Sequence, residues 1–317
     1  MSSATTIVAI TSTTAMSAMR YACTPRATSP NRFLYSQNIS ERCKENMNAH
    51  SYSNGVKKMH ERYRRMIIGS HDSCTESPKN PCLCICWPWA KTQSLSLEDQ
   101  FKIGVRLFDL RYHLEDDTYY ISHTFSTNYT VQQALTDLIS CAMDSEEYVY
   151  IRLKRDSSSV PLPEFGTALD RIMINSISLG EYVVRYDGRI LWDYMNKKPY
   201  NNKCIIIYSD NDTLRDDNVV SSWIFPQLFD TVETWDCSTV EDAVQRIHDK
   251  NFKQNGLPRA IFVDFSGLYP PKIAFECVWE QVKDMIVESI VGKEIECVMV
   301  NYANPEIVNM LYVLSLD

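Results

Sequence analysis

The stretch G-V-R-L-F-D-L-R at residues 104–111 decides the fold of this chain. It is a short apolar run of the kind that favours a buried strand, and charged side chains close it. Similar runs recur on both sides of it, and stretches with helical periodicity, such as 131–139 and 273–290, separate most of them. We predict eight strands, at residues 65–69, 105–110, 119–122, 148–153, 204–208, 229–234, 260–265 and 297–301.

This alternation of strands and helices predicts a parallel sheet with crossover helices. The fold class is therefore α/β, and eight strands between residues 61 and 317 favour an irregular (β/α)8 TIM barrel. A doubly wound sheet would show a glycine-rich first turn, and the chain has only nine glycines. One connection, residues 111–117, is too short for a helix, so we expect it to return along the barrel in extended form.

The composition sets the broad class of the protein. Of its 317 residues, 44% are hydrophobic, which is enough for a sizeable core. Lysine and arginine number 32 against 40 aspartates and glutamates, and the net charge of −8 disfavours a nucleic-acid partner. Residues 1–60 are rich in Ser, Thr, Ala and Asn without periodicity, and we predict that they form a flexible N-terminal extension.

The expected location is the cytoplasm or the surface of a membrane. No apolar run approaches the roughly 20 residues of a membrane-spanning helix. Eleven cysteines form an odd set without the spacing of a disulfide scaffold, which favours free thiols in a reducing compartment. Glycosylation sequons at Asn38, Asn128 and Asn211 leave secretion open as the alternative.

The polar residues that close the predicted strands indicate a catalytic rim, because barrels of this type carry their active groups at the carboxyl ends of strands. Two histidines and an arginine are expected there, since His71, Arg111 and His123 close or follow predicted strands. Cleavage of a phosphodiester by an internal hydroxyl needs this set: a base, an acid and a fixed cation for the phosphoryl oxygens. The alternative is that each histidine caps a strand or satisfies a turn.

Four motifs carry a resemblance to a known family. They are I-I-G-S-H-D-S at 67–73, W-A-K-T-Q-S-L-S-L-E-D-Q at 89–100, G-V-R-L-F-D-L-R at 104–111 and Y-I-S-H at 120–123. Together they resemble the X domain of phosphatidylinositol-specific phospholipase C, in its metal-independent bacterial and protozoan form. The similarity is densest over residues 65–156, and it implies that residues 61–317 form an X-like catalytic barrel that uses no metal and no other cofactor.

The resemblance implies a role for each matching residue. His71 resembles the general base that acts on the inositol 2-hydroxyl, and His123 resembles the general acid that protonates the diacylglycerol oxygen. Asp72 would orient His123, Arg111 matches the arginine that replaces calcium, and Asp109 matches the carboxylate beside that arginine. The implied substrate-binding residues are Lys154, Asp156, Asp236, Tyr208 and Asn301.

Two positions depart from the family pattern. Asn301 stands where the family has an aspartate bonded to the general base, and by analogy with serine proteases the missing charge would cost up to ~10⁴-fold in rate. Tyr208 stands where bacterial enzymes have an inositol-contacting arginine, which leaves headgroup selectivity open. Asp264 ends the seventh predicted strand and would restore the charge if it reached His71 in place of Asn301.

The segment P-C-L-C-I-C-W-P-W at 81–89 allows three interpretations. It is a packed rim loop with buried thiols, a loop that inserts Trp87 and Trp89 into a membrane interface, or a zinc or acylation site at Cys82, Cys84 and Cys86. The spacing lacks the paired cysteines and histidines of structural zinc sites, so no metal is expected. The expected partner is a phosphatidylinositol-containing membrane surface, contacted peripherally by a monomer.

The expected function is cleavage of phosphatidylinositol, or of glycosylphosphatidylinositol, to diacylglycerol and inositol 1,2-cyclic phosphate. An alternative is a catalytically weakened X domain that binds phosphoinositide headgroups or a protein partner, for which Asn301 and Tyr208 are the reason. A metal-dependent phosphodiesterase on a similar barrel is disfavoured, because Arg111 would lie where a divalent ion needs an acidic ligand.

Overall fold

The structure, a computed structural model, covers the predicted barrel and leaves parts of the chain undescribed. The described residues are 66–156, 161–186, 194, 197–209, 217, 223–225, 227–265 and 271–314. All of them belong to one unit. The predicted N-terminal extension, residues 1–60, lies outside the described residues.

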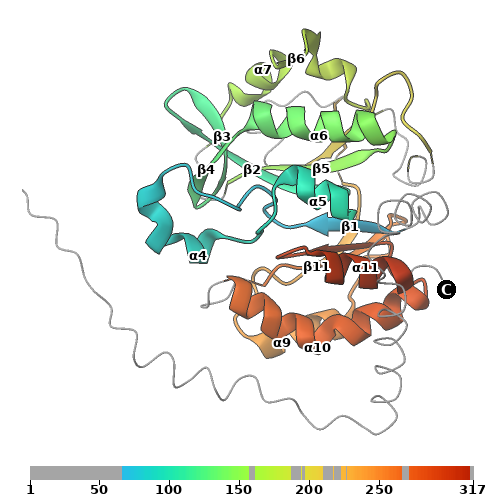
Figure 1. The fold of residues 1–317 in the computed structure, drawn as a ribbon. Helices are drawn as coiled ribbons and strands as arrows, with labels where there is room; N and C mark the ends of the chain where they lie inside the picture. The colour runs from blue at the N-terminus through green and yellow to red at the C-terminus, as the bar shows by residue number, and fades with distance from the viewer. Residues whose placement is uncertain are drawn as a thin grey trace, which may run out of the picture. The chain divides into compact units, whose positions relative to one another are not determined.

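A curled, mostly parallel sheet forms the centre of the molecule (Figure 1). Eight strands pair in parallel in the order β10-β11-β12-β1-β2-β5-β8-β9. Within the described residues β9 and β10 do not pair, so the sheet stays open at this seam. The predicted α/β fold with an irregular barrel is confirmed. The strands are β1 Ile67–Ser70, β2 Leu107–Glu115, β5 Val149–Arg155, β8 Ile205–Tyr208, β9 Ile224–Phe225, β10 Asp230–Glu233, β11 Arg259–Val263 and β12 Cys297–Val300.

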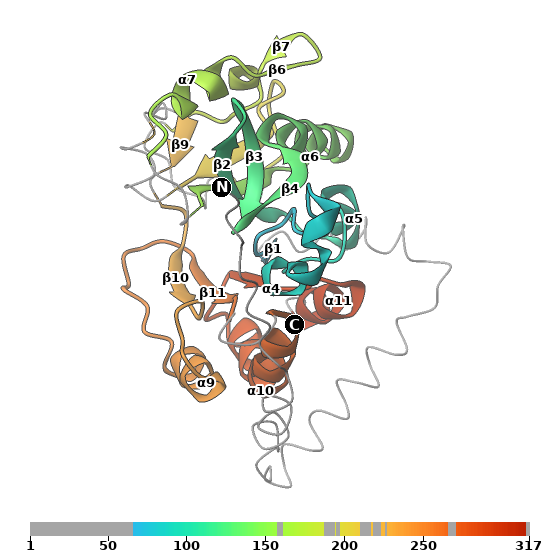
Figure 2. The ribbon, with the colours of Figure 1, turned by 90° about the vertical axis from the view of Figure 1, so that its left-hand side faces the viewer.

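The connection after β2 differs from the prediction. Residues 111–117 do not return in extended form between two parallel strands, because β2 runs on to Glu115 and turns back at Asp116 and Asp117. Both aspartates have positive φ, as a tight hairpin turn requires. The next strand, β3 Thr118–His123, is therefore antiparallel to β2, and β4 Phe125–Thr130 pairs antiparallel to β3 (Figure 2). In the parallel sheet β2 therefore pairs directly with β5, and the short β9, which was not predicted, adds the eighth strand beside β8.

Helices cover the outside of the sheet, with α6 on one side and α9 and α10 on the other (Figures 1 and 2). The predicted period in 131–139 is confirmed: α6 buries its apolar positions and begins with a capping box between Thr130 and Gln133. No helix in the described part of the chain is long and apolar enough to cross a membrane. The helices are η1 Pro81–Ile85, α4 Trp87–Ala90, α5 Leu97–Ile103, α6 Val131–Ser145, α7 Phe165–Asp170, η2 Leu179–Glu181, α9 Val240–Asp249, α10 Pro271–Val291 and α11 Pro305–Leu314; a small hairpin, β6 Met173–Ile174 and β7 Ile177–Ser178, follows α7.

An apolar cluster fills the barrel interior and sets the level of the polar residues. It includes Ile67, Leu107, Tyr150, Ile206, Phe262 and Met299, one from each of six strands. Side chains two residues further along a strand face the same way, so each strand places its next inward residue above this apolar layer. Those residues include Asp109, Arg152, Tyr208, Asp264 and Asn301. Strand periodicity thus gathers polar and charged side chains above an apolar layer.

Candidate active site

His71 is the centre of a buried polar cluster at the end of β1. Its side chain is 4% exposed, and its Nδ1 lies 2.8 Å from Oδ1 of Asn301, which follows β12. The amide oxygen accepts, so Nδ1 carries the proton and the neutral ring presents a lone pair at Nε2. Nη2 of Arg111 lies 2.8 Å from that atom. A base in the correct tautomer therefore faces a fixed cation.

Asp72 links both histidines to the arginine. Its backbone is left-handed, at φ 43°, a conformation that aspartate tolerates, and the turn directs its carboxylate across the site. Oδ1 lies 2.7 Å from Nε of Arg111, and Oδ2 lies 3.3 Å from Nε2 of His71 and 3.4 Å from Nε2 of His123. One buried carboxylate thus contacts the three groups that the predicted chemistry needs.

Asp109 is fully buried on β2 and stays ionised. Burial alone would raise the pKa of its carboxyl group, but the neighbouring guanidinium groups of Arg111 and Arg152 lower that pKa to about 2. Its Oδ2 lies 3.5 Å from Nη2 of Arg111, and its Oδ1 lies 3.9 Å from Nε of Arg152. The carboxylate therefore holds Arg111 together with Asp72, through a different nitrogen of the guanidinium.

The acidic groups of this cluster could attract a metal ion, but its basic group argues against one. His71, Asp72 and Asp109 bring potential ligand atoms within 4.8 Å of one another. The guanidinium of Arg111 contacts all three of these residues, at 2.8, 2.7 and 3.5 Å. A divalent cation would meet this positive charge at every ligand, so the residues present do not fit a metal.

His123 reaches the cluster through the hairpin rather than at the end of a parallel strand. Because β3 runs antiparallel to β2, its last residue returns to the level of the inward side chains of β2. Nδ1 of His123 lies 2.7 Å from the carbonyl oxygen of Ala90, which can only accept, so Nδ1 is protonated and Nε2 faces Asp72. The ring centroids of His71 and His123 are 6.3 Å apart.

Side chains of the 89–100 motif hold the loop after β1 in place. Nε2 of Gln93 donates to the carbonyl oxygens of His71 and Val300, at 2.9 and 3.1 Å, and so joins the ends of β1 and β12. Nε2 of Gln100 donates to the carbonyl oxygen of Ser73 at 2.7 Å. The hydroxyl of Thr92 donates to the carbonyl oxygen of Asp72 at 3.1 Å. These buried amides and hydroxyls fix the backbone that carries the histidine and the aspartate.

Asn301 and Asp264 occupy different sides of His71. Asn301 makes the bond that the sequence analysis gave to it, so Asp264 does not take its place. Asp264 instead lies on the Nε2 side, with Oδ2 at 3.9 Å from that nitrogen and without a hydrogen bond among the described residues. Burial raises the pKa of Asp264 to about 6, while the nearby His71 lowers it. The site thus keeps a carboxylate close to its base despite Asn301.

The other predicted substrate-binding residues lie in three different settings. Asp156 is buried and supports the hairpin, because its Oδ2 accepts from the hydroxyl of Ser122 at 2.6 Å and from the backbone N–H of Thr124 at 3.0 Å. Lys154 pairs in register with Arg111 and points to the same side of the sheet. Asp236 lies on the surface beyond β10 and pairs with Arg246. Tyr208 is buried at the end of β8.

Comparison with known proteins was made for both the sequence and the fold, and no family model matches the chain. The chain is 36% identical over 101 residues to a PI-PLC X-box domain-containing protein of Dictyostelium discoideum, a match that covers 28% of this chain and spans about 14% of that relative's length. It also shares its fold with the phosphatidylinositol-specific phospholipase C of Listeria monocytogenes, at 17% identity, with a TM-score of 0.55 and coverage of 80% of this chain and 94% of that one. The chain is phosphatidylinositol-specific phospholipase C X-domain-like.

The same fold occurs in a mutant of the phosphatidylinositol-specific phospholipase C of Staphylococcus aureus. That match has 17% identity and a TM-score of 0.54, and it covers 83% of this chain and 99% of the other. The resemblance read from the four motifs is therefore confirmed. Because the structural matches are this low in identity, they establish the X-domain-like barrel and leave the residue roles to the chemistry of this chain.

The sequence analysis did not single out three residues on or after β5 and β10: Arg152, Glu233 and Trp235. Arg152 lies on β5, and its Nη2 is 3.1 Å from Oε1 of Glu233 on β10. Trp235 follows β10, and 58% of its side chain is exposed. A signal for Arg152 was available, because Arg152, Lys154 and Asp156 alternate along one face of a strand. Glu233 and Trp235 had no such signal, since nothing local shows which strand they face.

The structure contradicts part of the prediction for the segment 81–89. Trp87 is buried, at 5% exposure, so it cannot insert into a membrane, whereas Trp89 is 57% exposed. Cys82 and Cys86 are exposed, so the expectation of buried thiols is wrong for them, and they carry no disulfide. The same short α4 holds both Trp89 and Ala90, whose carbonyl orients His123.

Proposed function

We propose that this chain cleaves phosphatidylinositol or glycosylphosphatidylinositol to diacylglycerol and inositol 1,2-cyclic phosphate, without a metal ion. One observation carries the proposal: Asp72 contacts His71, His123 and Arg111 at 3.3, 3.4 and 2.7 Å. This brings a base, an acid and a phosphate-binding cation together around one carboxylate. The likeness to bacterial enzymes named phosphatidylinositol-specific phospholipases C supports the substrate class.

In the proposed step His71 is the general base and His123 the general acid. Nε2 of His71 takes the proton of the inositol 2-hydroxyl, and the oxygen forms a bond to phosphorus. The bond from phosphorus to the diacylglycerol oxygen breaks, and the proton on Nε2 of His123 goes to that oxygen. Arg111 binds the phosphoryl oxygens, for which its planar pair of N–H groups is suited.

The charges around His71 stabilise the ring once it has taken the proton. Protonation of Nε2 creates an imidazolium with the carboxylates of Asp72, Asp109 and Asp264 at 3.3, 3.6 and 3.9 Å. These carboxylates replace the charge that Asn301 does not supply. In the free protein Arg111 donates to Nε2 of His71, so the substrate phosphate must draw the guanidinium away before the base acts.

The proposed partner is the surface of a phosphatidylinositol-containing membrane. Trp89 stands exposed on α4, beside the carbonyl that orients His123, and an indole at that place suits the interface between lipid and water. A related structure, at 18% identity and a TM-score of 0.52, concerns membrane binding of the Staphylococcus aureus phospholipase. The chain would act there as a peripheral protein, from the cytoplasm or, as the alternative, after secretion.

A second candidate function is a catalytically weakened X-like domain that binds phosphoinositide headgroups. The 2.8 Å contact between Arg111 and the lone pair of His71 favours it, because a base that stays capped transfers no proton. Such a protein would bind headgroups through Arg111 and Lys154 without cleaving them.

The experiment measures release of water-soluble inositol phosphate from phosphatidylinositol vesicles in excess chelator. Wild type is compared with His71→Ala, His123→Ala and Arg111→Ala. His248→Ala is the control, because His248 is an exposed histidine on α9 and is not part of the cluster. We expect turnover by wild type and by the control, and at least a ~10³-fold loss in the other three variants. Inert wild type with intact headgroup binding would favour the second candidate, and loss of wild-type turnover in chelator would overturn the metal-free mechanism.

A further inference from the structure

The turn that follows His123 is tight and its backbone is strained. Figure 2 shows β3 and β4 side by side, and His123 at the end of β3 pairs in register with Phe125 at the start of β4. Thr124 alone therefore connects the two strands, and its φ of 67° lies in the left-handed region. A β-branched residue is an outlier there, because its side chain crowds the backbone, whereas glycine adopts this conformation freely. Something outside the turn must hold it.

Asp156 bonds to the residues on both sides of His123. Its Oδ2 accepts from the hydroxyl of Ser122 at 2.6 Å and from the backbone N–H of Thr124 at 3.0 Å. Asp156 is 3% exposed, and its own N–H donates to the carbonyl oxygen of Tyr112 on β2 at 2.9 Å. Hydrogen bonds to a carboxylate are stronger than those between neutral groups, so this pair is suited to hold a strained backbone.

The ring of His123 depends on this turn for its position. Nδ1 lies 2.7 Å from the carbonyl oxygen of Ala90, and Nε2 lies 3.4 Å from Oδ2 of Asp72. Neither contact sets the backbone from which the ring projects. Because Thr124 is the only connecting residue, its relaxation to an ordinary negative φ would rotate the end of β3. The ring would then leave the carbonyl, the carboxylate or both.

We propose that Asp156 is a positioning residue for the proposed general acid. It keeps Thr124 in the left-handed conformation, and the ring of His123 stays between Ala90 and Asp72 as a result. The inference rests on the proposed function for the role of His123 as the acid. It gives Asp156 an action through the backbone in place of the substrate contact expected from the sequence. Deep burial and two donors on one carboxylate oxygen favour this role.

The test combines two substitutions, the second of which removes the need for the first residue. Asp156→Ala should lower kcat on phosphatidylinositol vesicles by ~10- to 100-fold and change KM less than about threefold, because the acid is misplaced while the binding groups remain. Thr124→Gly alone should keep kcat within about twofold, since glycine adopts positive φ without support. In the double variant kcat should recover at least about fivefold over Asp156→Ala.

Asp156→Asn provides the same comparison with a milder change. Its amide oxygen still accepts but carries no charge, so kcat should fall by only about three- to tenfold, and Thr124→Gly should restore it. The rescue is therefore measurable even where the alanine variant does not fold. Thermal unfolding shows which variants retain the fold. An unchanged kcat in both Asp156 variants would overturn the proposal.

Ser176→Gly is the matched control for the rescue. Ser176 is exposed in the turn between β6 and β7 and has φ 66°, so glycine relieves the same kind of strain in a different hairpin. Added to Asp156→Ala, it should leave kcat at the value of the single variant. Equal recovery by Thr124→Gly and Ser176→Gly would indicate general stabilisation and overturn the proposal. A raised KM without rescue, as expected for a substrate contact, would also overturn it.

The tautomer of His123 tests the same point without turnover. Nitrogen NMR of the full chain with labelled histidine distinguishes the two neutral tautomers, and His123→Ala identifies the signals among the six histidines. Wild type should show a protonated Nδ1, which donates to Ala90. Asp156→Ala should show both tautomers, and added Thr124→Gly should restore the single one.

This readout separates the inference from the proposed function. The expected tautomer pattern in a chain that releases no inositol phosphate would keep the positioning role and remove the enzymatic proposal. Turnover by wild type together with an unchanged tautomer and kcat in Asp156→Ala would keep the enzyme and remove the positioning role.

Discussion

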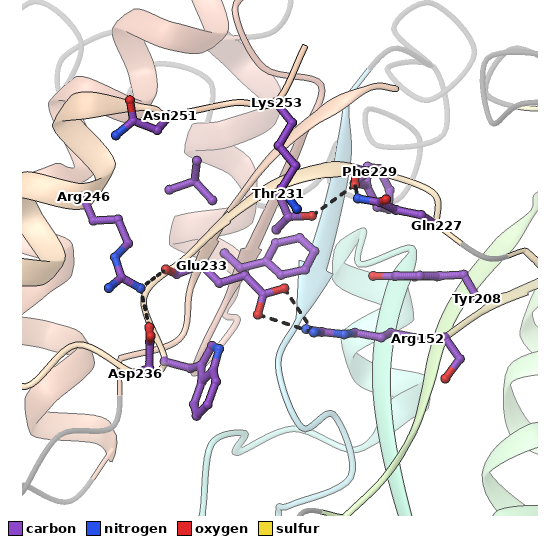
Figure 3. Close-up of a pocket in the computed structure, with 14 residues that line it drawn as sticks. Arg152, Tyr208, Gln227, Phe229, Thr231, Glu233, Asp236, Arg246, Asn251 and Lys253 are labelled. Atoms are coloured by element: carbon purple, nitrogen blue, oxygen red, sulfur yellow. Dashed lines mark hydrogen bonds and ion pairs between the residues drawn. The ribbon is translucent and has the colours of Figure 1, made fainter. Parts of the chain in front are cut away.

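The catalytic cluster differs from the neighbouring cavity, which Arg152, Tyr208 and Glu233 help to line (Figure 3), in how its charges are placed. In the cluster, Asp72 and Asp109 surround Arg111 at 2.7 and 3.5 Å, so opposite charges meet before any substrate arrives. In the cavity, the hydroxyls of Tyr208 and Ser209 meet no acceptor among the described residues. The charges of the cluster are therefore preorganised for chemistry. Substitutions that remove a charge from the cluster should accordingly have the largest effects on the rate.

The largest effect is expected at Asp72, because it contacts both histidines and the arginine. Asp72→Asn keeps the shape of the side chain but removes the charge that supports two imidazolium ions. We expect kcat to fall by ~10³-fold, while the temperature of thermal unfolding shows that the fold is retained. Turnover assays and thermal unfolding of the same preparation measure both values.

Asp284→Asn is the matched control, since Asp284 is exposed on α10 and should leave both values unchanged. An unchanged kcat in Asp72→Asn would show that the charge of Asp72 does not support the two histidines, and would break the comparison.

Asp264 and Asn301 provide the next largest effect, within the cluster itself. Asp264→Asn should lower kcat by ~10- to 100-fold, because it removes a carboxylate 3.9 Å from Nε2 of His71. Asn301→Asp adds a charge at Nδ1 and should raise kcat by less than tenfold, since three carboxylates already face the ring. Steady-state kinetics of both variants measure these changes in kcat. A large gain in Asn301→Asp beside an unchanged Asp264→Asn would mean that Asp264 contributes nothing to the base.

Much of this cluster was predictable, and the cavity was not. His71, Arg111 and His123 lie within 53 residues of one another in motifs that close apolar runs, so local sequence carries their placement. His123 lies beside Asp72 although the predicted path of its strand was wrong: a two-aspartate turn makes β3 antiparallel and still returns its last residue to the cluster. Local pattern reports where a strand ends but not which way it pairs.

The cavity depends on distances that no local pattern contains. Arg152 and Glu233 are 81 residues apart, and they meet because the sheet curls and brings β10, at one end of the strand order, close to β5. Likewise, Trp87 and Trp89 are the same residue type two positions apart in one short segment, yet packing buries one and exposes the other. Such facts follow from tertiary structure rather than from periodicity.

A smaller effect is expected on stability, and it again concerns Asp264. Because burial raises its pKa to about 6, ionising this carboxyl group costs free energy in the folded state, and that cost appears as the pH rises from about 4 to above 6. Asp264→Asn removes the cost and keeps an amide oxygen that can accept from Thr234. We expect the variant to gain of the order of 3 kcal/mol in unfolding free energy above pH 6 and almost nothing near pH 4.

Urea unfolding at several pH values measures this difference. Asp109 is the contrast, because its lowered pKa stabilises the fold above pH 4 and this contribution is lost as the pH falls toward 2. A gain in Asp264→Asn that does not depend on pH would show that Asp264 is not the group that titrates.

The smallest effect concerns Trp89, which lies outside both regions. Trp89→Ala should weaken partition onto phosphatidylinositol vesicles several-fold, because an exposed indole no longer enters the interface. Hydrolysis of a soluble substrate should change less than twofold, since the Ala90 carbonyl still orients His123. Tyr200→Ala is the control, because Tyr200 is 74% exposed on a different segment. Equal loss of partition in both variants would mean that the membrane meets a broad surface rather than the rim beside His123, and sedimentation with vesicles distinguishes the two outcomes.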